Sequence, residues 1–283
     1  FYARSNKVMG ETSVKSLKNI LTVFVLTLLC LTLSSPVALA TEYISFGFWP
    51  ANTDPTTYEP NWTVLTHVAN LDWNINADGT LVGKNSDTDS HNKIIISKAR
   101  SNGIRFLIGA GTGQTNSDSI LAYHQDEFAQ NIANKINSTG AEGVILDLEY
   151  PFEVNSYTGT SNTPLLESTM KKIYTKVKAI NSTYTVSLCT PPYFDENTVC
   201  FKNPNLSNYI DFVFIMGYDY YWNGPTGANS PFYNNFTRYG LKYAVAEQSE
   251  CYGKDKIIYG VPLYAYEYTT NSNLPGASIT SAN

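Results

Sequence analysis

Two kinds of apolar pattern alternate along the chain. Short, nearly continuous apolar runs are separated by longer segments in which apolar residues recur at helical spacing. A continuous run is typical of a strand covered on both faces, and a recurring pattern is typical of a helix with one buried face. The runs predict seven strands, which lie at Ile44–Trp49, His67–Ile75, Ile104–Ile108, within Glu142–Pro151, and at Tyr184–Leu188, Asp211–Tyr218 and Ile257–Tyr266.

The recurring segments predict the helices between these strands. They lie at Trp62–Thr66, Asp89–Ser101, Ser119–Ile136, Leu165–Ile180 and Arg238–Gln248. Strands that alternate with helices indicate parallel βαβ units. We therefore predict an α/β fold, a (β/α)8 TIM barrel of which seven strands are visible in this chain.

The last part of the chain lacks the pattern of an eighth strand. After Tyr266 the tail Thr269–Asn283 consists mainly of small and polar residues. A glycine-rich stretch, Gly109–Gly113, follows the third predicted strand and is expected to be a tight loop. We expect one catalytic barrel over residues 41–283 that is incomplete at its C-terminal end.

The first forty residues have the pattern of a secretory signal peptide. Two lysines precede the apolar run Ile20–Leu33, and the small residues of Ala38–Ala40 follow it. We expect cleavage after Ala40 and a secreted or cell-surface protein without stable membrane insertion, because the run is short for a membrane span. An uncleaved anchor is the alternative. Met9 is a second candidate start, which would make residues 1–8 extra sequence.

Composition narrows the classes of function. Hydrophobic residues make up 43% of the chain and charged residues 15%, which indicates a packed globular protein. The net charge of −5 and the lack of a basic patch argue against a nucleic-acid partner. The three cysteines after the signal, Cys189, Cys200 and Cys251, permit one disulfide and leave one thiol over. No metal site, no cofactor and a monomeric state are expected.

Two carboxylates stand at the end of the fourth predicted strand. Asp147 and Glu149 are two residues apart, which places both on one face of a strand with Cα atoms roughly 6–7 Å apart. Acids within an apolar run at a strand end indicate acid/base chemistry. The competing interpretation is a loop acid with a chance neighbour.

The residues around these acids resemble a known family. Gly143–Pro151 reads G-V-I-L-D-L-E-Y-P and is similar to the signature D-G-x-D-x-D-x-E-Y-P of family 18 glycoside hydrolases, which include chitinases and related N-acetylglucosaminidases. The resemblance covers roughly residues 44–266. Other segments match in order, namely Leu65–Val68, Asp78–Thr80, Met216–Asp219, Thr226–Pro231 and Lys256–Tyr264.

The chain departs from this signature at two positions. Ile145 stands where the signature has an aspartate, and Glu142 replaces the aspartate before glycine. The third-strand serine-glycine motif is matched only loosely, and the eighth-strand tryptophan is absent. A branch of the family that acts on bacterial cell-wall glycans also tends to lack the first aspartate. The substrate therefore stays open among chitin-like chains, cell-wall glycan and the chitobiose core of N-glycans.

The resemblance implies roles for three residues. Glu149 would be the general acid and base, and a raised pKa would come from burial or from the neighbouring Asp147. Asp147 would hold the acetamido N–H of the substrate, and Tyr218 would donate to the acetamido oxygen. Because Ile145 removes a proton-sharing acid, we expect a lower pKa of Asp147 and either slower turnover or a shifted pH optimum.

Four further residues are candidate sugar contacts. Asp219 would contact the sugar or orient Tyr218, and Trp222, Tyr264 and Tyr266 would stack on sugar rings or pack the barrel rim. The predicted function is a secreted glycosidase cleaving β-linked N-acetylglucosamine-containing glycans with retention. The alternative is a non-hydrolytic, lectin-like protein on the same barrel. Its partner in either case would be an N-acetylglucosamine-containing polysaccharide or glycan.

Overall fold

The computed structural model describes residues 43–50, 53–149, 151–221, 224–233, 240–274 and 277–282. Almost all of them belong to one compact unit, Ile44–Asn283. The predicted signal peptide, residues 1–40, lies outside the described residues. Among the helices that are described, none has the length and apolar character needed to cross a membrane.

Seven parallel strands form a curled sheet. Their order in the sheet follows their order in the chain, and each neighbouring pair is parallel. A short antiparallel strand, β3 (Leu81–Gly83), pairs with β2. The parallel strands are β1 (Phe46–Phe48), β2 (His67–Ile75), β4 (Arg105–Thr112), β5 (Gly143–Leu148), β6 (Thr185–Thr190), β7 (Phe212–Ile215) and β8 (Ile257–Tyr259). The prediction of seven barrel strands is confirmed.

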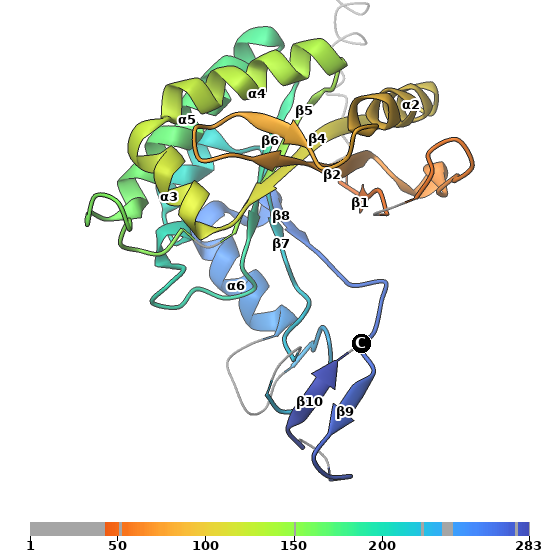
Figure 1. The fold of residues 1–283 in the computed structure, drawn as a ribbon, viewed down its shortest axis with the longest axis vertical. Helices are drawn as coiled ribbons and strands as arrows, with labels where there is room; N and C mark the ends of the chain where they lie inside the picture. The colour runs from red at the N-terminus through yellow and green to blue at the C-terminus, as the bar shows by residue number, and fades with distance from the viewer. Residues whose placement is uncertain are drawn as a thin grey trace, which may run out of the picture. The chain divides into compact units, whose positions relative to one another are not determined.

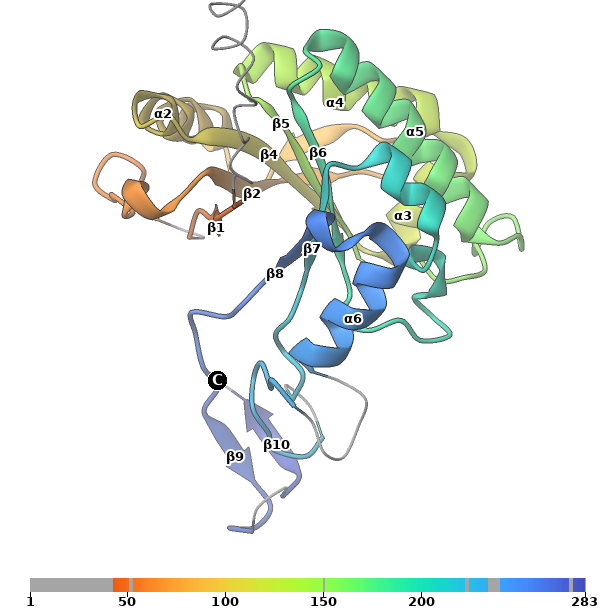
Figure 2. The ribbon, with the colours of Figure 1, turned by 180° about the vertical axis from the view of Figure 1, so that it is seen from behind.

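Helices follow the strands and cover the outside of the sheet (Figures 1 and 2). Helix α4 packs on α5 and against β5, and α6 lies beside β8. The helices are α2 (Thr88–Ser101), α3 (Gln114–Tyr123), α4 (Gln125–Thr139), α5 (Asn162–Ile180) and α6 (Leu241–Tyr252). Short 3₁₀ turns lie at η1 (Trp62–Val64), η2 (Val199–Phe201), η3 (Pro204–Tyr209) and η4 (Lys254–Lys256).

The sheet curls far enough for its first strand to meet its sixth across the interior. Phe46 and Phe48 of β1 point inward, as do Phe212 and Phe214 of β7. The ring centroids of Phe46 and Phe212 are 5.8 Å apart, and those of Phe48 and Phe214 are 5.0 Å apart. Aromatic rings at this separation are in edge contact. The sheet is therefore a nearly closed barrel whose lumen is filled by side chains.

Several segments differ from the sequence prediction, among them β7, which ends at Ile215 and not at the predicted Tyr218. Gly109–Thr112 continues β4 instead of forming a loop, and a Cβ on Gly109 would lie 2.5 Å from the Asn70 carbonyl oxygen. The single helix predicted at Ser119–Ile136 is two helices, because His124 between them has non-helical dihedral angles. Strand β8 ends at Tyr259, shortly before Pro262, which cannot donate to a ladder.

The last described residues form a second, separate sheet. Strands β9 (Tyr268–Thr270) and β10 (Ile279–Ala282) pair with each other in antiparallel fashion. In the part of the chain that the structure describes, neither pairs with β1 or β8, so they do not close the barrel.

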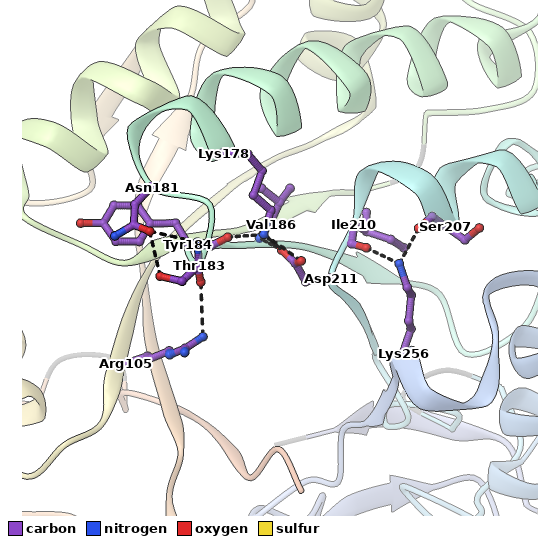
Figure 3. A network of polar contacts seen from close by, with 10 residues as sticks. All are labelled: Arg105, Lys178, Asn181, Thr183, Tyr184, Val186, Ser207, Ile210, Asp211 and Lys256. Atoms are coloured by element: carbon purple, nitrogen blue, oxygen red, sulfur yellow. Dashed lines mark hydrogen bonds and ion pairs between the residues drawn. The ribbon is translucent and has the colours of Figure 1, made fainter. Parts of the chain in front are cut away.

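A network of polar contacts joins the amino-terminal ends of β6, β7 and β8 (Figure 3). The Lys178 ammonium is 2.8 Å from Asp211 Oδ1, and Asp211 Oδ2 accepts a 2.7 Å hydrogen bond from the Val186 amide. Lys256 donates to the Ile210 carbonyl at 2.6 Å. Asp211 therefore ties helix α5 to two adjacent strands.

We expect Asp211→Ala to lower the free energy of unfolding by roughly 2–3 kcal/mol, because it leaves the buried Val186 amide without its acceptor and the Lys178 ammonium without its counter-charge. Asp126→Ala is the matched control. It removes the more exposed Lys172–Asp126 pair and should cost less than about 1 kcal/mol. Denaturant unfolding measures both values. Equal losses in the two variants would show that the network does not stabilise the barrel.

His67 makes the stability of the barrel depend on pH. Its ring is buried between Phe46 and Phe212, with centroids 6.4 and 5.9 Å away. Burial, and secondarily Arg105, lowers the pKa of His67 from 6.5 to about 4. The neutral ring is thus the folded form, as expected for a core histidine.

A lowered folded pKa means that the stabilisation is present above pH 6.5 and is lost as pH falls toward 4. We expect His67→Phe to remove roughly 2–3 kcal/mol of this pH dependence. Denaturant unfolding at pH 4.5 and 7 tests this, with His91→Gln at a more exposed position as the control. An unchanged slope in His67→Phe would contradict the assignment.

Candidate active site

Strand β5 places its two acids at the carboxyl end of the barrel. Its residues alternate, so that Val144 and Leu146 pack under the helices while Ile145 packs in the lumen. By the same alternation Asp147 is inward. Glu149 follows the strand, and its amide donates to the Thr112 carbonyl at 2.9 Å.

Asp147 is held in a confined environment. Its Oδ1 atom is fully buried and has no hydrogen-bond partner among the described residues. Gly111 lies opposite on β4, and a Cβ there would come within 3.3 Å of the Asp147 Cβ. The pKa of Asp147 is raised from 3.8 to about 7, first by burial and then by Glu149, while Lys84 opposes the shift. The carboxyl therefore changes charge near neutral pH.

This pKa differs from the expectation based on Ile145. We expected the missing acid at that position to lower the pKa of Asp147. Ile145 is fully buried, and burial of Asp147 is the largest cause of its raised pKa. Desolvation of a carboxylate can shift a pKa by several units. The apolar lumen therefore outweighs the missing neighbour.

Glu149 is exposed and opens on a cleft of about 660 Å³. Three other predicted site residues, Tyr218, Asp219 and Tyr266, line the same cleft. The remaining lining residues are Phe152, Pro191, Pro192, Tyr193, Asp195, Asn197, Thr198 and Met216. A separate hollow of about 580 Å³ beside Trp49 and Asp72 contains none of the predicted residues. The cleft at Glu149 is therefore the candidate site.

Asp219 holds two of the predicted aromatic residues. Its Oδ1 accepts hydrogen bonds from the hydroxyls of Tyr264 at 2.6 Å and Tyr266 at 2.8 Å. Its own φ is +61°, a left-handed conformation that is uncommon outside glycine. The Asp219 amide donates to Asn229 Oδ1 at 2.7 Å, which supports this conformation. Asp219 thus links the segment after β7 to the segment after β8.

Tyr218 lies between the acids and this tyrosine cluster. Its ring is in edge contact with Tyr264, with centroids 6.3 Å apart. The pKa of Tyr218 is raised well above 10, first by burial and then by Cys189 and Asp147. The hydroxyl therefore keeps its proton and can donate a hydrogen bond.

The two stacking candidates after β8 differ in position. Tyr266 lines the cleft, whereas Tyr264 is half-exposed and is not among the lining residues. Trp222 lies outside the described residues. The three cysteines are free thiols, so the permitted disulfide is not formed among Cys189, Cys200 and Cys251. The described residues contain no cluster that could hold a metal ion.

Sequence reasoning missed one wall of the cleft. The segment after β6 supplies Tyr193, Asp195 and Thr198, and Thr198 donates to Asp195 Oδ1. The only signal was the proline pair, Pro191 and Pro192, at the carboxyl end of that strand. In barrels such strand-to-helix segments build the site.

Comparisons with known proteins agree with this geometry. The sequence profile of the glycosyl hydrolases family 18 matches residues 42–282. Probable chitinase 10 of Drosophila melanogaster is 21% identical over 152 residues, which are 50% of this chain and 7% of that protein. The chain thus spans a small part of the length of this relative.

Several solved structures share the fold. The Group IV chitinase of Ostrinia furnacalis has a TM-score of 0.74 at 18% identity, over 85% of this chain and 73% of that one. The chitinase-like agglutinin RobpsCRA of Robinia pseudoacacia has a TM-score of 0.72 at 15% identity, over 85% and 77%. The profile match covers most of the chain, and the chain therefore belongs to the glycosyl hydrolases family 18.

Proposed function

We propose that this protein is a secreted glycosidase that hydrolyses β-linked N-acetylglucosamine glycans with retention of configuration. The observation that carries the proposal is the pair of acids at the carboxyl end of β5, an exposed Glu149 in the cleft and an inward Asp147 with a pKa of about 7. Family membership supports a chitin-related glycoside hydrolase or a chitinase-like protein. An N-acetylglucosamine polymer as substrate is in line with Ostrinia furnacalis Group IV chitinase solved with allosamidin.

Glu149 would begin the reaction as a carboxylic acid. It donates its proton to the glycosidic oxygen while the bond from that oxygen to the anomeric carbon breaks. The acetamido oxygen of the same sugar bonds to the anomeric carbon and forms an oxazolinium ion. Glu149, now a carboxylate, then takes a proton from water. The water oxygen bonds to the anomeric carbon, and the bond from the acetamido oxygen to that carbon breaks. Two inversions at one carbon give net retention.

Asp147 and Tyr218 would hold the acetamido group during these steps. The Tyr218 hydroxyl donates to the acetamido oxygen and keeps it in line with the anomeric carbon. The Asp147 carboxylate accepts the acetamido N–H. The positive charge that develops on the oxazolinium ring lowers the pKa of Asp147, so its charged form is favoured when it is needed.

Asp219 and Tyr266 would contact the bound sugar at the rim. Asp219 has one carboxylate oxygen occupied by two tyrosine hydroxyls, which leaves the other oxygen for a sugar hydroxyl. Tyr266 lines the cleft, and the ring of Tyr264 is in edge contact with that of Tyr218.

A lectin-like function is the second candidate. The agglutinin from Robinia pseudoacacia shows that this fold also occurs in a protein described as an agglutinin. The feature that favours the enzyme is Glu149 itself, because a binding protein has no need for an acid beside the glycosidic bond. Binding without turnover would favour the lectin.

We expect Glu149→Gln to lower kcat/KM on fluorogenic chito-oligosaccharides by about 10²–10⁴-fold, because the amide cannot donate the proton. Stability should change by less than about 0.5 kcal/mol, since the side chain is exposed. Glu142→Gln, just before the same strand, is the matched control and should keep full activity. Equal rates in wild type and Glu149→Gln would refute the catalytic assignment.

Asp147 should reduce stability at alkaline pH. Because its folded pKa is raised, its carboxyl favours folding below pH 3.8, and this contribution is lost as pH rises through 7. We expect Asp147→Asn to be inactive but more stable than wild type at pH 8 by roughly 3 kcal/mol, with a smaller difference at pH 5. Denaturant unfolding at both values measures this. Asp126→Asn, an exposed acid, is the control, and a pH-independent difference would exclude the raised pKa.

A further inference from the structure

The barrel lumen contains two buried polar atoms without partners. Among the described residues, four buried side-chain atoms lack a hydrogen bond, namely Trp73 Nε1, Ser117 Oγ, Asp147 Oδ1 and Ser187 Oγ. Two of these, Asp147 Oδ1 and Ser187 Oγ, belong to β5 and β6, which lie side by side (Figures 1 and 2). A buried polar group without a partner is unfavourable, because it has lost its hydrogen bonds to water and gained none in the protein.

Strand register places Ser187 diagonally below Asp147 in the lumen. Ile145 pairs with Ser187. Val186 and Leu188 pack outward under the helices, while Cys189 packs in the lumen, so Ser187 also points inward. Ser187 is thus one inward position below Asp147 on the neighbouring strand. From the strand spacing and rise, their Cα atoms are about 8 Å apart.

We infer that Ser187 is a positioning residue for Asp147, with its hydroxyl linked to Asp147 Oδ1 through one buried water. A serine hydroxyl oxygen lies about 2.4 Å from its Cα and an aspartate carboxylate oxygen about 3.5 Å, so the two side chains can lean toward each other across this spacing and leave a gap that fits one water bridge. Both partners are polar, and the weakly polar Cys189 thiol lies in the same part of the lumen. A single bridge satisfies both orphan atoms.

Most of the other lumen positions below Asp147 are apolar or lack a side chain. Ile145 is apolar, and Gly109 and Gly111 on the other side of Asp147 have no side chain. Leu107, Phe212 and Phe214 fill the space below. The Ser187 hydroxyl therefore supplies the polar contact on the lumen side of Asp147, and it holds the carboxylate below Glu149.

This link has a measurable electrostatic effect. A donor that reaches a carboxylate favours its charged form. Ser187→Ala removes the donor and leaves the apolar lumen, so the titration midpoint of Asp147 should rise by about one pH unit. The importance of Ser187 for catalysis rests on the proposed function. Its effect on the titration of Asp147 does not, since that titration can be followed without substrate.

The experiment is a ¹³C NMR titration of aspartate carboxyls in the folded protein, with the Asp147 resonance assigned from Asp147→Asn. Ser117→Ala is the matched control, because Ser117 is also fully buried with an unpartnered hydroxyl but lies on α3. We expect an upward shift in Ser187→Ala, no shift in Ser117→Ala and a wild-type midpoint in Ser187→Thr. Equal midpoints in both alanine variants would overturn the inference.

Activity gives an independent second readout. The limb of the kcat/KM pH profile that follows Asp147 should move with the NMR midpoint in Ser187→Ala and stay in place in Ser117→Ala. If the wild type is inactive but the Asp147 midpoint still shifts in Ser187→Ala, the proposed function is wrong and the inference about Ser187 holds. If Ser187→Ala does not fold, Ser187→Cys replaces it, because a thiol is a weak donor of similar size. An unshifted midpoint there would also count against the link.

Discussion

The two-residue alternation of β5 inside a sheet covered on both faces is the constraint on which the site depends. It sends Val144 and Leu146 to the helices and commits Ile145 and Asp147 to the lumen. A shift of one residue would exchange these two sets, and the acid would lie under the helices. The apolar residues of this strand thus determine where the carboxylate points, because their burial outweighs the cost of confining one charge.

The cost of confining this carboxylate appears as a raised pKa of Asp147. The lumen that packs Phe46 and Phe48 against β7 also desolvates Asp147 and raises its pKa to about 7. Glu149, one inward position higher, emerges into the cleft. The end of β5 and the residue that follows it therefore offer one carboxyl in an apolar setting and one that is exposed. Two carboxyl groups in such different environments can take different roles in one reaction, although they are the same functional group.

The sequence predicted the scaffold better than the surroundings of the acids. Strand β2 has the predicted bounds, since continuous apolar runs are local features. Asp147 and Glu149 were found because acids interrupt such a run. The division of the helix at His124 was missed, since one non-helical residue barely disturbs the spacing of the apolar residues. The wall at Tyr193 and Asp195 was missed because loop residues carry no periodic signal.

By itself the sequence determined the order of strands and helices, the parallel barrel and the acids on one strand end. Only the tertiary structure decided which distant residues meet, because such contacts depend on strand register and on the curl of the sheet. It joined Asp219 to Tyr264 and Tyr266, and it placed Ser187 opposite Ile145, one inward position below Asp147. It also decided the charge state of Asp147, because burial is a property of the whole barrel and not of neighbouring residues in the chain.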